Sequence, residues 1–138
     1  MILRNLVVAC ALAGAAAVGA QEKTTPATML QQLEAAARAG DARFVGFSAQ
    51  RGAAFFADKH GRDLACATCH QADPRAVGRH ASTGREIAPL APSANPQRFT
   101  DAAKTAKWFK RNCNDVLGRE CTPVEKGDLL AWLLGKAT

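Results

Sequence analysis

The sequence has no second C-x-x-C pair and no H-x-x-x-H spacing, and no β-α-β pattern surrounds the one C-x-x-C that it does contain. The first absence argues against a zinc ribbon, which needs a second pair of ligands at a matching distance. The second argues against a thioredoxin-like redox dithiol, which lies beside a β-α-β unit. The cysteine pair therefore needs a different explanation, and the residue that follows it supplies one.

The pair belongs to the pentapeptide Cys66-Ala67-Thr68-Cys69-His70. C-x-x-C-H is the attachment sequence for a c-type haem. Two cysteines three residues apart reach the two vinyl-derived carbons on one edge of the porphyrin, and the next residue places its imidazole under the iron. The motif predicts one covalent haem c, bound through Cys66 and Cys69, with His70 as the proximal iron ligand.

One apolar run, residues 6–18, follows Arg4 near the start of the sequence. The run is too short to span a bilayer. Val18-Gly19-Ala20 then provides the small residues that are typical of a signal-peptidase site. We therefore predict a cleaved signal peptide over residues 1–20 and a mature protein in the bacterial periplasm, with an uncleaved anchor as the alternative.

Removal of that segment would leave four of the five cysteines. If Cys66 and Cys69 bind haem, then Cys113 and Cys121 remain, eight positions apart in an oxidising compartment. Such a pair predicts one disulfide. Two free thiols, or a thiolate bound to the iron, are the alternatives.

The chain is basic, with a formal net charge of +6. Part of this charge can offset the haem propionates, and the rest would steer an acidic protein partner toward the haem edge. The predicted periplasmic location and the lack of any nucleic-acid-binding motif argue against nucleic acid as the partner.

The sequence shows helical patterns joined by loops and no convincing strand pattern. We therefore predict an all-α fold. We predict helices over Thr28–Ala39, from Ser48 to about Asp58, from Thr100-Asp101 onward, and from Thr122 to about Leu134. A long proline-containing loop, residues 71–99, follows the haem motif. It would be unusual in a compact domain unless it wraps one face of the haem.

The order of these features resembles class I cytochromes c. A helix with Gly52 and Phe56 precedes the haem motif, and an aromatic residue, Trp132, lies in the terminal helix. The resemblance implies that these two helices cross at the glycine. Ile87-Ala88-Pro89-Leu90 looks like the proline loop of that family, whose carbonyl would accept a hydrogen bond from His70 Nδ1. An ordinary loop proline is the alternative for Pro89.

The sequence departs from class I electron carriers in its methionines. Those carriers supply a methionine sulfur to the iron from downstream of the haem motif, whereas Met1 and Met29 both lie upstream. The usual methionine ligation is therefore excluded. The remaining candidates for the sixth ligand are a lysine, water, or one of five side chains: His60, His80, Asn95, Asn112 and Asn114.

Three segments resemble the oxygen-binding sphaeroides haem protein (SHP) family of monohaem cytochromes c: residues 95–101, 107–113 and 117–126. The resemblance extends over roughly residues 48–134. It implies that Asn112 is the sixth ligand of ferric iron and is released on reduction, beside a Cys113–Cys121 disulfide. A related cytochrome has histidine at this position. Trp108, one turn before Asn112, is a candidate wall of the distal pocket, with a plain core position as the alternative.

The predicted organisation is a signal peptide (residues 1–20), an extension with an extra N-terminal helix (21–47) and a class I cytochrome c-like domain around one haem (48–138). The resemblance implies that the reduced protein binds O₂, NO or CO and receives electrons from a dihaem cytochrome c, supplied in turn by a membrane cytochrome b. Turnover as an oxygen- or NO-reactive haem oxidoreductase would then be possible, but no general acid or base stands out. A simple periplasmic electron carrier and a haem-based gas sensor without turnover are the alternatives.

Overall fold

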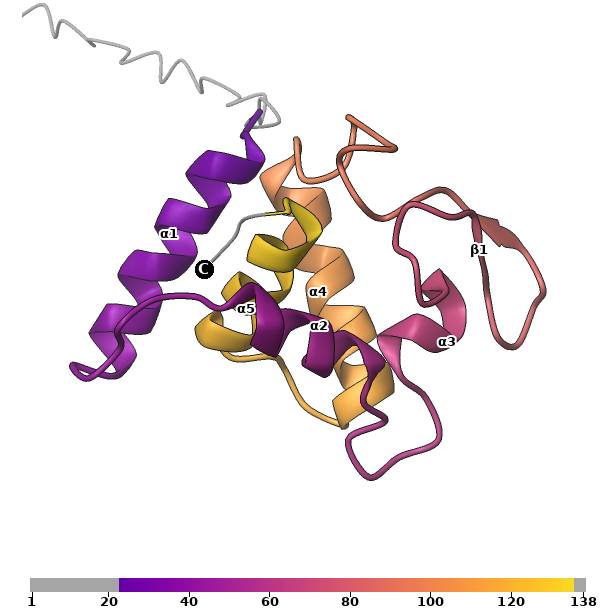
Figure 1. Ribbon diagram of the computed structural model, residues 1–138, viewed down its shortest axis with the longest axis horizontal. Helices are drawn as coiled ribbons and strands as arrows, with labels where there is room; N and C mark the ends of the chain where they lie inside the picture. The colour runs from indigo at the N-terminus through magenta and orange to yellow at the C-terminus, as the bar shows by residue number, and fades with distance from the viewer. Residues whose placement is uncertain (1–22, 136–138) are drawn as a thin grey trace, which may run out of the picture.

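The computed structural model describes residues 23–135, so the predicted signal peptide lies outside the described residues. The division into an extension and a domain stays a prediction. Within residues 23–135, no helix combines the length and the apolarity needed to cross a membrane. The elements, shown in Figure 1, are α1 (Pro26–Gly40), α2 (Ala49–Ala57), α3 (Cys66–His70), β1 (Gly78–Arg79), β2 (Glu86–Ile87), α4 (Ala102–Leu117) and α5 (Pro123–Leu133).

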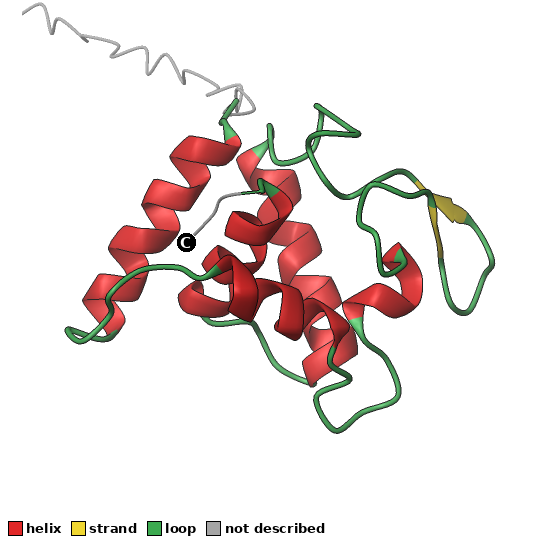
Figure 2. Ribbon diagram, in the orientation of Figure 1, coloured by secondary structure: helices red, strands yellow, loops and turns green. Residues whose placement is uncertain are grey.

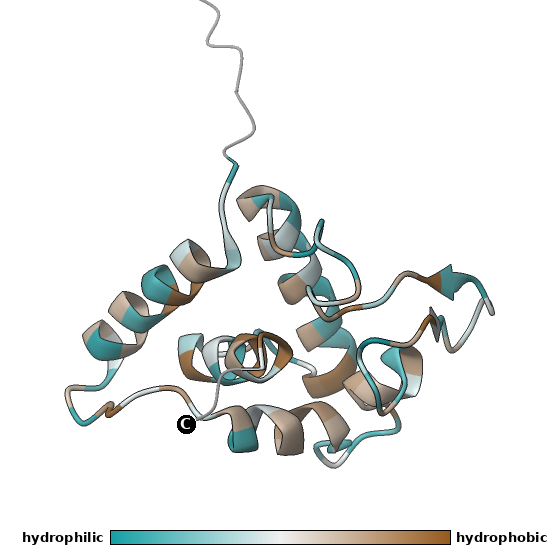
Figure 3. Cartoon of the chain, turned by 45° about the horizontal axis from the view of Figure 1, so that its top comes forward, coloured by the Kyte–Doolittle hydropathy of each residue, from teal (hydrophilic) through white to brown (hydrophobic). Residues whose placement is uncertain are grey.

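The fold is all-α, as predicted, and its most extensive contact is between α2 and α5. The Ser48 hydroxyl accepts a hydrogen bond from the Arg51 backbone N–H at the start of α2. Gly52 allows the two helices to approach closely, and Phe56 and Leu130 are almost completely buried. Figure 3 shows α5 near the centre of the molecule with strongly hydrophobic residues. The predicted crossing of these helices at a glycine is confirmed.

The extra N-terminal helix, α1, packs on α5. It begins after Thr25, whose hydroxyl accepts a hydrogen bond from the Thr28 backbone N–H. The segment that follows places the Phe47 ring directly against Gly127 of α5, where a Cβ atom would overlap the ring. The extension is therefore packed against the same helix that α2 contacts.

Helix α4 is attached to the rest of the molecule near both of its ends. At its start, Asp101 caps the first turn through its side chain, and the Thr24 N–H donates to the Thr100 carbonyl over 3.0 Å. Toward its end, Cys113 forms a disulfide with Cys121, which lies just before α5. The predicted disulfide is thus present in the structure.

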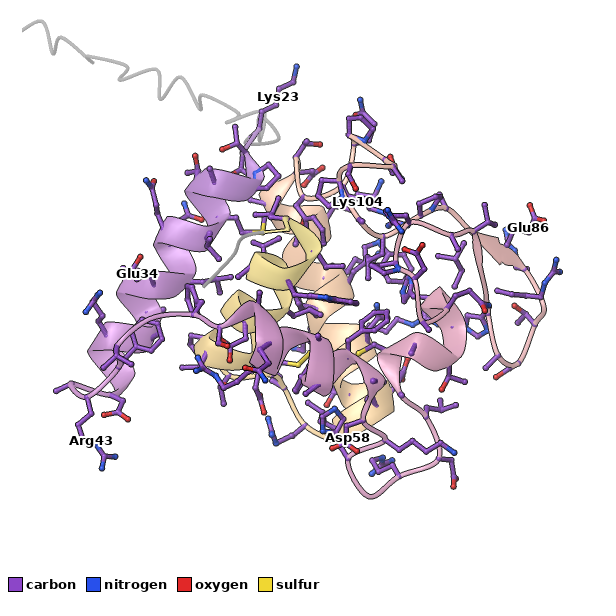
Figure 4. All side chains as sticks on the ribbon, in the orientation of Figure 1. Lys23, Glu34, Arg43, Asp58, Glu86 and Lys104 are labelled. Carbon is purple, nitrogen blue, oxygen red and sulfur yellow. A yellow bond between two sulfur atoms is a disulfide. The ribbon has the colours of Figure 1, made fainter. Side chains whose placement is uncertain are left out.

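The segment between α3 and α4 differs from the structureless loop expected from the sequence. It contains a small antiparallel hairpin in which Gly78 pairs with Ile87 and Arg79 with Glu86. Figure 2 shows these strands as a short interruption in a long loop, and Figure 4 shows the Glu86 side chain pointing away from the helices. Two-residue strands are too short to give an alternating sequence pattern, which is why the sequence did not indicate them.

Candidate functional site

The C-x-x-C-H motif forms its own short helix, α3. The Ala65 backbone N–H donates to Thr68 Oγ1 over 3.0 Å, which helps to start the turn. Cys66 and Cys69 are both free thiols, and both are partly buried. His70 ends the helix, also partly buried. One helical turn thus presents two thiols and an imidazole in sequence.

Apolar side chains surround this turn. The buried cluster of Phe56, Leu129 and Leu133 is in contact with a set of partly buried residues that includes Cys66 of the motif. The Phe56 ring lies 6.5 Å from the His70 ring and 4.8 Å from the Trp132 ring, between centroids. The partly buried residues of the set are Cys66, Ala67, Leu90, Phe99, Phe109 and Trp132.

Burial sets the protonation states of two residues of the motif, Cys66 and His70. It raises the pKa of the Cys66 thiol to about 11, so this side chain stays protonated at neutral pH. Burial, together with a smaller effect of the positive charge of Arg98, lowers the pKa of the His70 imidazole to about 4. A neutral imidazole has a lone pair free for a metal, which suits the ligand role predicted for His70.

The chain that follows His70 folds back over α3. A Cβ atom at Gly78 would overlap the Cys69 carbonyl oxygen and lie 3.1 Å from the His70 Cα, so only glycine fits at this point. The Pro74 carbonyl accepts hydrogen bonds from the Leu90 and Ala91 backbone N–H groups, at 2.8 and 2.9 Å. These bonds place the predicted proline loop next to the segment that leaves the motif.

Arg98 holds the proline loop in this position. Its Nε donates to the Pro89 carbonyl over 2.8 Å, and its Nη2 donates to the Ala88 carbonyl. Asn95 Nδ2 also donates to the Pro89 carbonyl, over 3.3 Å. Within residues 23–135, His70 Nδ1 makes no hydrogen bond to this loop, and the Pro89 oxygen accepts from Arg98 and Asn95.

Asn112 lies on α4, next to the disulfide cysteine Cys113, and is exposed. Its side chain makes no hydrogen bond to any residue that the structure describes. Trp108, one turn earlier on the helix, is 43% exposed, and the Arg111 guanidinium lies 5.5 Å from the centre of its ring. The alternative of a buried core position for Trp108 does not agree with this exposure.

The four rival side chains have local hydrogen-bond partners. His60 Nε2 is 2.9 Å from the Phe55 carbonyl oxygen, and His80 Nδ1 accepts from the backbone of its own hairpin turn. Asn95 donates to the proline loop, and Asn114 Nδ2 donates to the Lys110 carbonyl over 2.8 Å. Of the five candidates, Asn112 is thus the side chain left without such a partner in the described part of the chain.

The residues present fit a covalent haem. Cys66 and Cys69 are reduced in a molecule whose other two described cysteines are joined, so both thiols are available for thioether bonds. The apolar cluster beside them offers the kind of surface that a porphyrin contacts. An all-α fold with C-x-x-C-H on a short helix between two crossing helices defines a c-type cytochrome of the class I type.

Comparison with known proteins gives a narrower assignment. Residues 42–133 match the family model described as "Domain of unknown function (DUF1924)". Over 134 residues, 94% of this chain and 96% of the other, the sequence is 48% identical to the cytochrome c-type protein SHP of Cereibacter sphaeroides. Cytochrome c'' of Methylophilus methylotrophus is 47% identical over 79 residues, which cover 57% of this chain and 55% of that protein.

Solved structures agree with the sequence comparison. Oxidised SHP, described as an oxygen-binding cytochrome c, has a TM-score of 0.72 at 48% identity, over 83% of this chain and all of that one. Oxidised cytochrome c'' has a TM-score of 0.71 at 36% identity, over 82% of this chain and 94% of that one. The chain belongs to the SHP family of c-type cytochromes, which carry covalent haem c.

Sequence reasoning missed two parts of this site. Gly78 was not singled out, although an isolated glycine in a loop can mark a close backbone approach. Arg98 was noted only as part of the segment 95–101, and its contact with the proline loop was not predicted. Its partners, the Ala88 and Pro89 carbonyls, come into reach only when the loop has folded.

Proposed function

We propose that this protein is a periplasmic monohaem cytochrome c in which Cys66 and Cys69 bind the haem and His70 and Asn112 are the axial ligands of ferric iron. The observation that carries the proposal is the hydrogen bonding of the candidate ligands: His60, His80, Asn95 and Asn114 all have local partners and Asn112 has none among the described residues. Family membership supports the same assignment, because the SHP resemblance implies an asparagine ligand at this position.

The chemistry of an amide oxygen favours release on reduction. The Asn112 oxygen is a neutral, hard donor, which suits Fe(III) better than the softer Fe(II). Reduced iron would attract this oxygen less strongly, and the exposed Asn112 side chain would then be free to rotate away. A haem held by one histidine supplies an iron with one open position, the arrangement that binds O₂, NO and CO.

The surroundings of Asn112 support a ligand that moves over a short range. The Cys113–Cys121 disulfide fixes the adjacent backbone, with 5.6 Å between the two Cα atoms. Movement is therefore confined to the Asn112 side chain and does not require α4 to shift. Trp108 lies on the same side of α4 and provides an apolar wall beside the released ligand position.

The descriptions of two relatives support gas binding and ligand release, whereas the proposed electron supply rests on the family resemblance in the sequence. One is described as an oxygen-binding cytochrome c, and the solution structure of cytochrome c'' is described as giving insight into haem–ligand detachment. For this chain we accordingly include O₂ and NO as ligands of the reduced form. Electrons come from a dihaem cytochrome c that is supplied by a membrane cytochrome b, and the predicted signal peptide directs export.

The first test compares the spectra of the two oxidation states of the purified holoprotein. Absorption and resonance Raman spectroscopy should show six-coordinate ferric iron and high-spin, five-coordinate ferrous iron that binds CO rapidly. A low-spin ferrous spectrum with two protein ligands would contradict the proposal and favour a simple electron carrier.

The second test assigns the ligand. Asn112→Ala should retain the covalent haem but change the ferric spectrum. Asn114→Ala is the matched control, because it removes an exposed asparagine two residues away that donates to the Lys110 carbonyl. An N112A protein with the ferric spectrum of the wild type would remove Asn112 from the site.

A further inference from the structure

Gly78, the first residue of β1, packs directly on the backbone of the haem motif. A Cβ atom at this position would overlap the Cys69 carbonyl oxygen and would lie 3.1 Å from the His70 Cα atom. Gly78 is buried, and Figure 1 shows β1 beside α3. A residue beyond the motif therefore contacts the backbone of the proposed iron ligand itself.

The chain reaches this contact through an unusual turn. Gln71, which directly follows His70, has φ 64° and ψ 166°. Glycine adopts this region of backbone space readily, whereas other residues are found there only where the surrounding structure holds them. From this turn the chain returns over α3 and brings Gly78 onto the Cys69 carbonyl. The return is thus a held feature of the fold and not a loose loop.

The same contact sets the position of the hairpin and of the proline loop. Gly78 pairs with Ile87, which begins that loop. Further along, the Leu90 and Ala91 N–H groups donate to the Pro74 carbonyl, at 2.8 and 2.9 Å. These bonds tie the two ends of the returning segment together, and Gly78 joins the segment to the backbone of α3.

We infer that Gly78 is a positioning residue for the proximal histidine: without a side chain there, β1 lies on the Cys69–His70 peptide and fixes the backbone that carries the imidazole. The inference rests on the proposed function, in which His70 binds the iron. A ligand must be held within about 0.5 Å of its working position, and residues that do not touch the metal supply this support. Gly78 touches backbone and not the reacting atoms, so its effect passes through His70.

Gly78→Ala in the holoprotein tests the inference. The added methyl group overlaps the Cys69 carbonyl, so either the hairpin moves away or α3 shifts. Both movements remove the support of the His70 backbone, and the imidazole lone pair is then no longer held in one direction. Resonance Raman spectroscopy of the ferrous protein measures the iron–histidine stretching band. In G78A this band should broaden and shift to lower frequency, because a misaligned lone pair binds the iron less strongly.

Gly84→Ala is the matched control, because it changes a glycine of the same hairpin that does not contact α3. Gly84 has φ 66°, and no atom lies within 4 Å of its Cβ position. G84A should lower the thermal unfolding temperature through backbone strain and leave the iron–histidine band unchanged. Equal band shifts in G78A and G84A would assign the effect to a weakened hairpin and overturn the inference.

The outcomes also separate this inference from the proposed function. A wild-type ferrous protein without an iron–histidine band overturns both. A G78A protein that loses stability but keeps the wild-type band overturns only the role of Gly78, which would then be structural. If G78A does not mature into holoprotein, the wild-type ferrous CO complex decides the question. Its NMR spectrum should show a nuclear Overhauser effect between the α protons of Gly78 and His70, and the absence of this signal contradicts the contact.

Discussion

Gly52 of α2 lies directly against the backbone carbonyl of Asp128 of α5, so closely that a Cβ atom at this position would overlap the carbonyl oxygen. The same Cβ would lie 3.0 Å from the Leu129 nitrogen. Because both obstacles belong to the backbone of a helix, neither can move aside as the end of a flexible side chain can. The crossing that places Phe56 next to His70 therefore depends on the missing side chain at Gly52.

Replacing Gly52 with alanine should reduce the free energy of unfolding by about 1–3 kcal/mol, because the added methyl group forces α2 away from α5. Urea denaturation followed by circular dichroism measures the change. Gly40→Ala is the matched control: no atom lies within 4 Å of its Cβ position at the end of α1, so this variant should be neutral or slightly stabilised. Equal denaturation midpoints for G52A and the wild type would contradict the close crossing.

Asp128 ties the start of α2 to α5 through its buried carboxylate. The Ser48 backbone N–H donates to Oδ1 over 2.6 Å, and Arg51 donates to both oxygens over 2.7 and 2.8 Å. Asp128→Asn should lower the free energy of unfolding by about 2–3 kcal/mol, because a neutral amide cannot accept from all three donors. Thermal unfolding measures this change. Asp115→Asn, which alters an exposed pair with Arg111 at 3.9 Å, should have little effect in that experiment.

The helices could be predicted from the sequence because their starts are set by neighbouring residues. Ser48, Asp101 and Thr122 each accept a hydrogen bond from a backbone N–H within the first turn, so each cap is chosen locally. The haem motif is equally local. In contrast, the fit of the Phe47 ring against Gly127 joins residues far apart in the chain, and nothing near either residue indicates the other.

The candidate ligand shows the same limit. Sequence chemistry alone left a lysine, water and five named side chains open as the sixth ligand, and the SHP resemblance was needed to favour Asn112. Asn112 differs from the other candidate side chains in the structure because those side chains form hydrogen bonds with nearby groups. For example, His80 accepts from the Ser82 and Thr83 N–H groups, and Asn95 donates to the Pro89 carbonyl. These hydrogen bonds form only in the folded loop, so they could not be predicted from the spacing of residues in the sequence.

Glu125 should make the stability of the α5 start depend on pH. Hydrogen bonds from Arg119, at 2.7 and 2.9 Å, are the main cause that lowers the pKa of Glu125 from 4.5 to about 2, with a further contribution from Thr122. A carboxyl group whose pKa is lower in the folded state stabilises the fold above its unfolded pKa, near 4.5, and loses this effect as the pH falls toward about 2.

Glu125→Gln should therefore cost about 1 kcal/mol at neutral pH, and the difference from the wild type should disappear on acidification through this range. Thermal unfolding at a series of pH values measures the difference. Glu120→Gln is the control, because Glu120 is exposed and lies 3.7 Å from the Lys110 ammonium group. A difference between E125Q and the wild type that stays constant with pH would show that the carboxylate charge does not matter there.

The Cys113–Cys121 disulfide should affect the ferric ligand as well as stability, because it fixes the backbone next to Asn112. Cys113→Ser with Cys121→Ser should lower the free energy of unfolding by roughly 2–3 kcal/mol, the value expected for a short closed loop. It should also convert part of the ferric iron to a high-spin form, because Asn112 is no longer held at one distance from the iron. Electron paramagnetic resonance of the ferric holoprotein measures that fraction.

Gly52→Ala provides the comparison that separates these two effects, because it should reduce stability by a similar amount at a helix crossing that does not include Asn112. If the disulfide acts on the ligand, the double serine variant gains high-spin ferric iron at a temperature where G52A does not. Equal ferric spectra in both variants and the wild type would mean that α4 alone holds Asn112 in place, and the disulfide would then contribute only to stability.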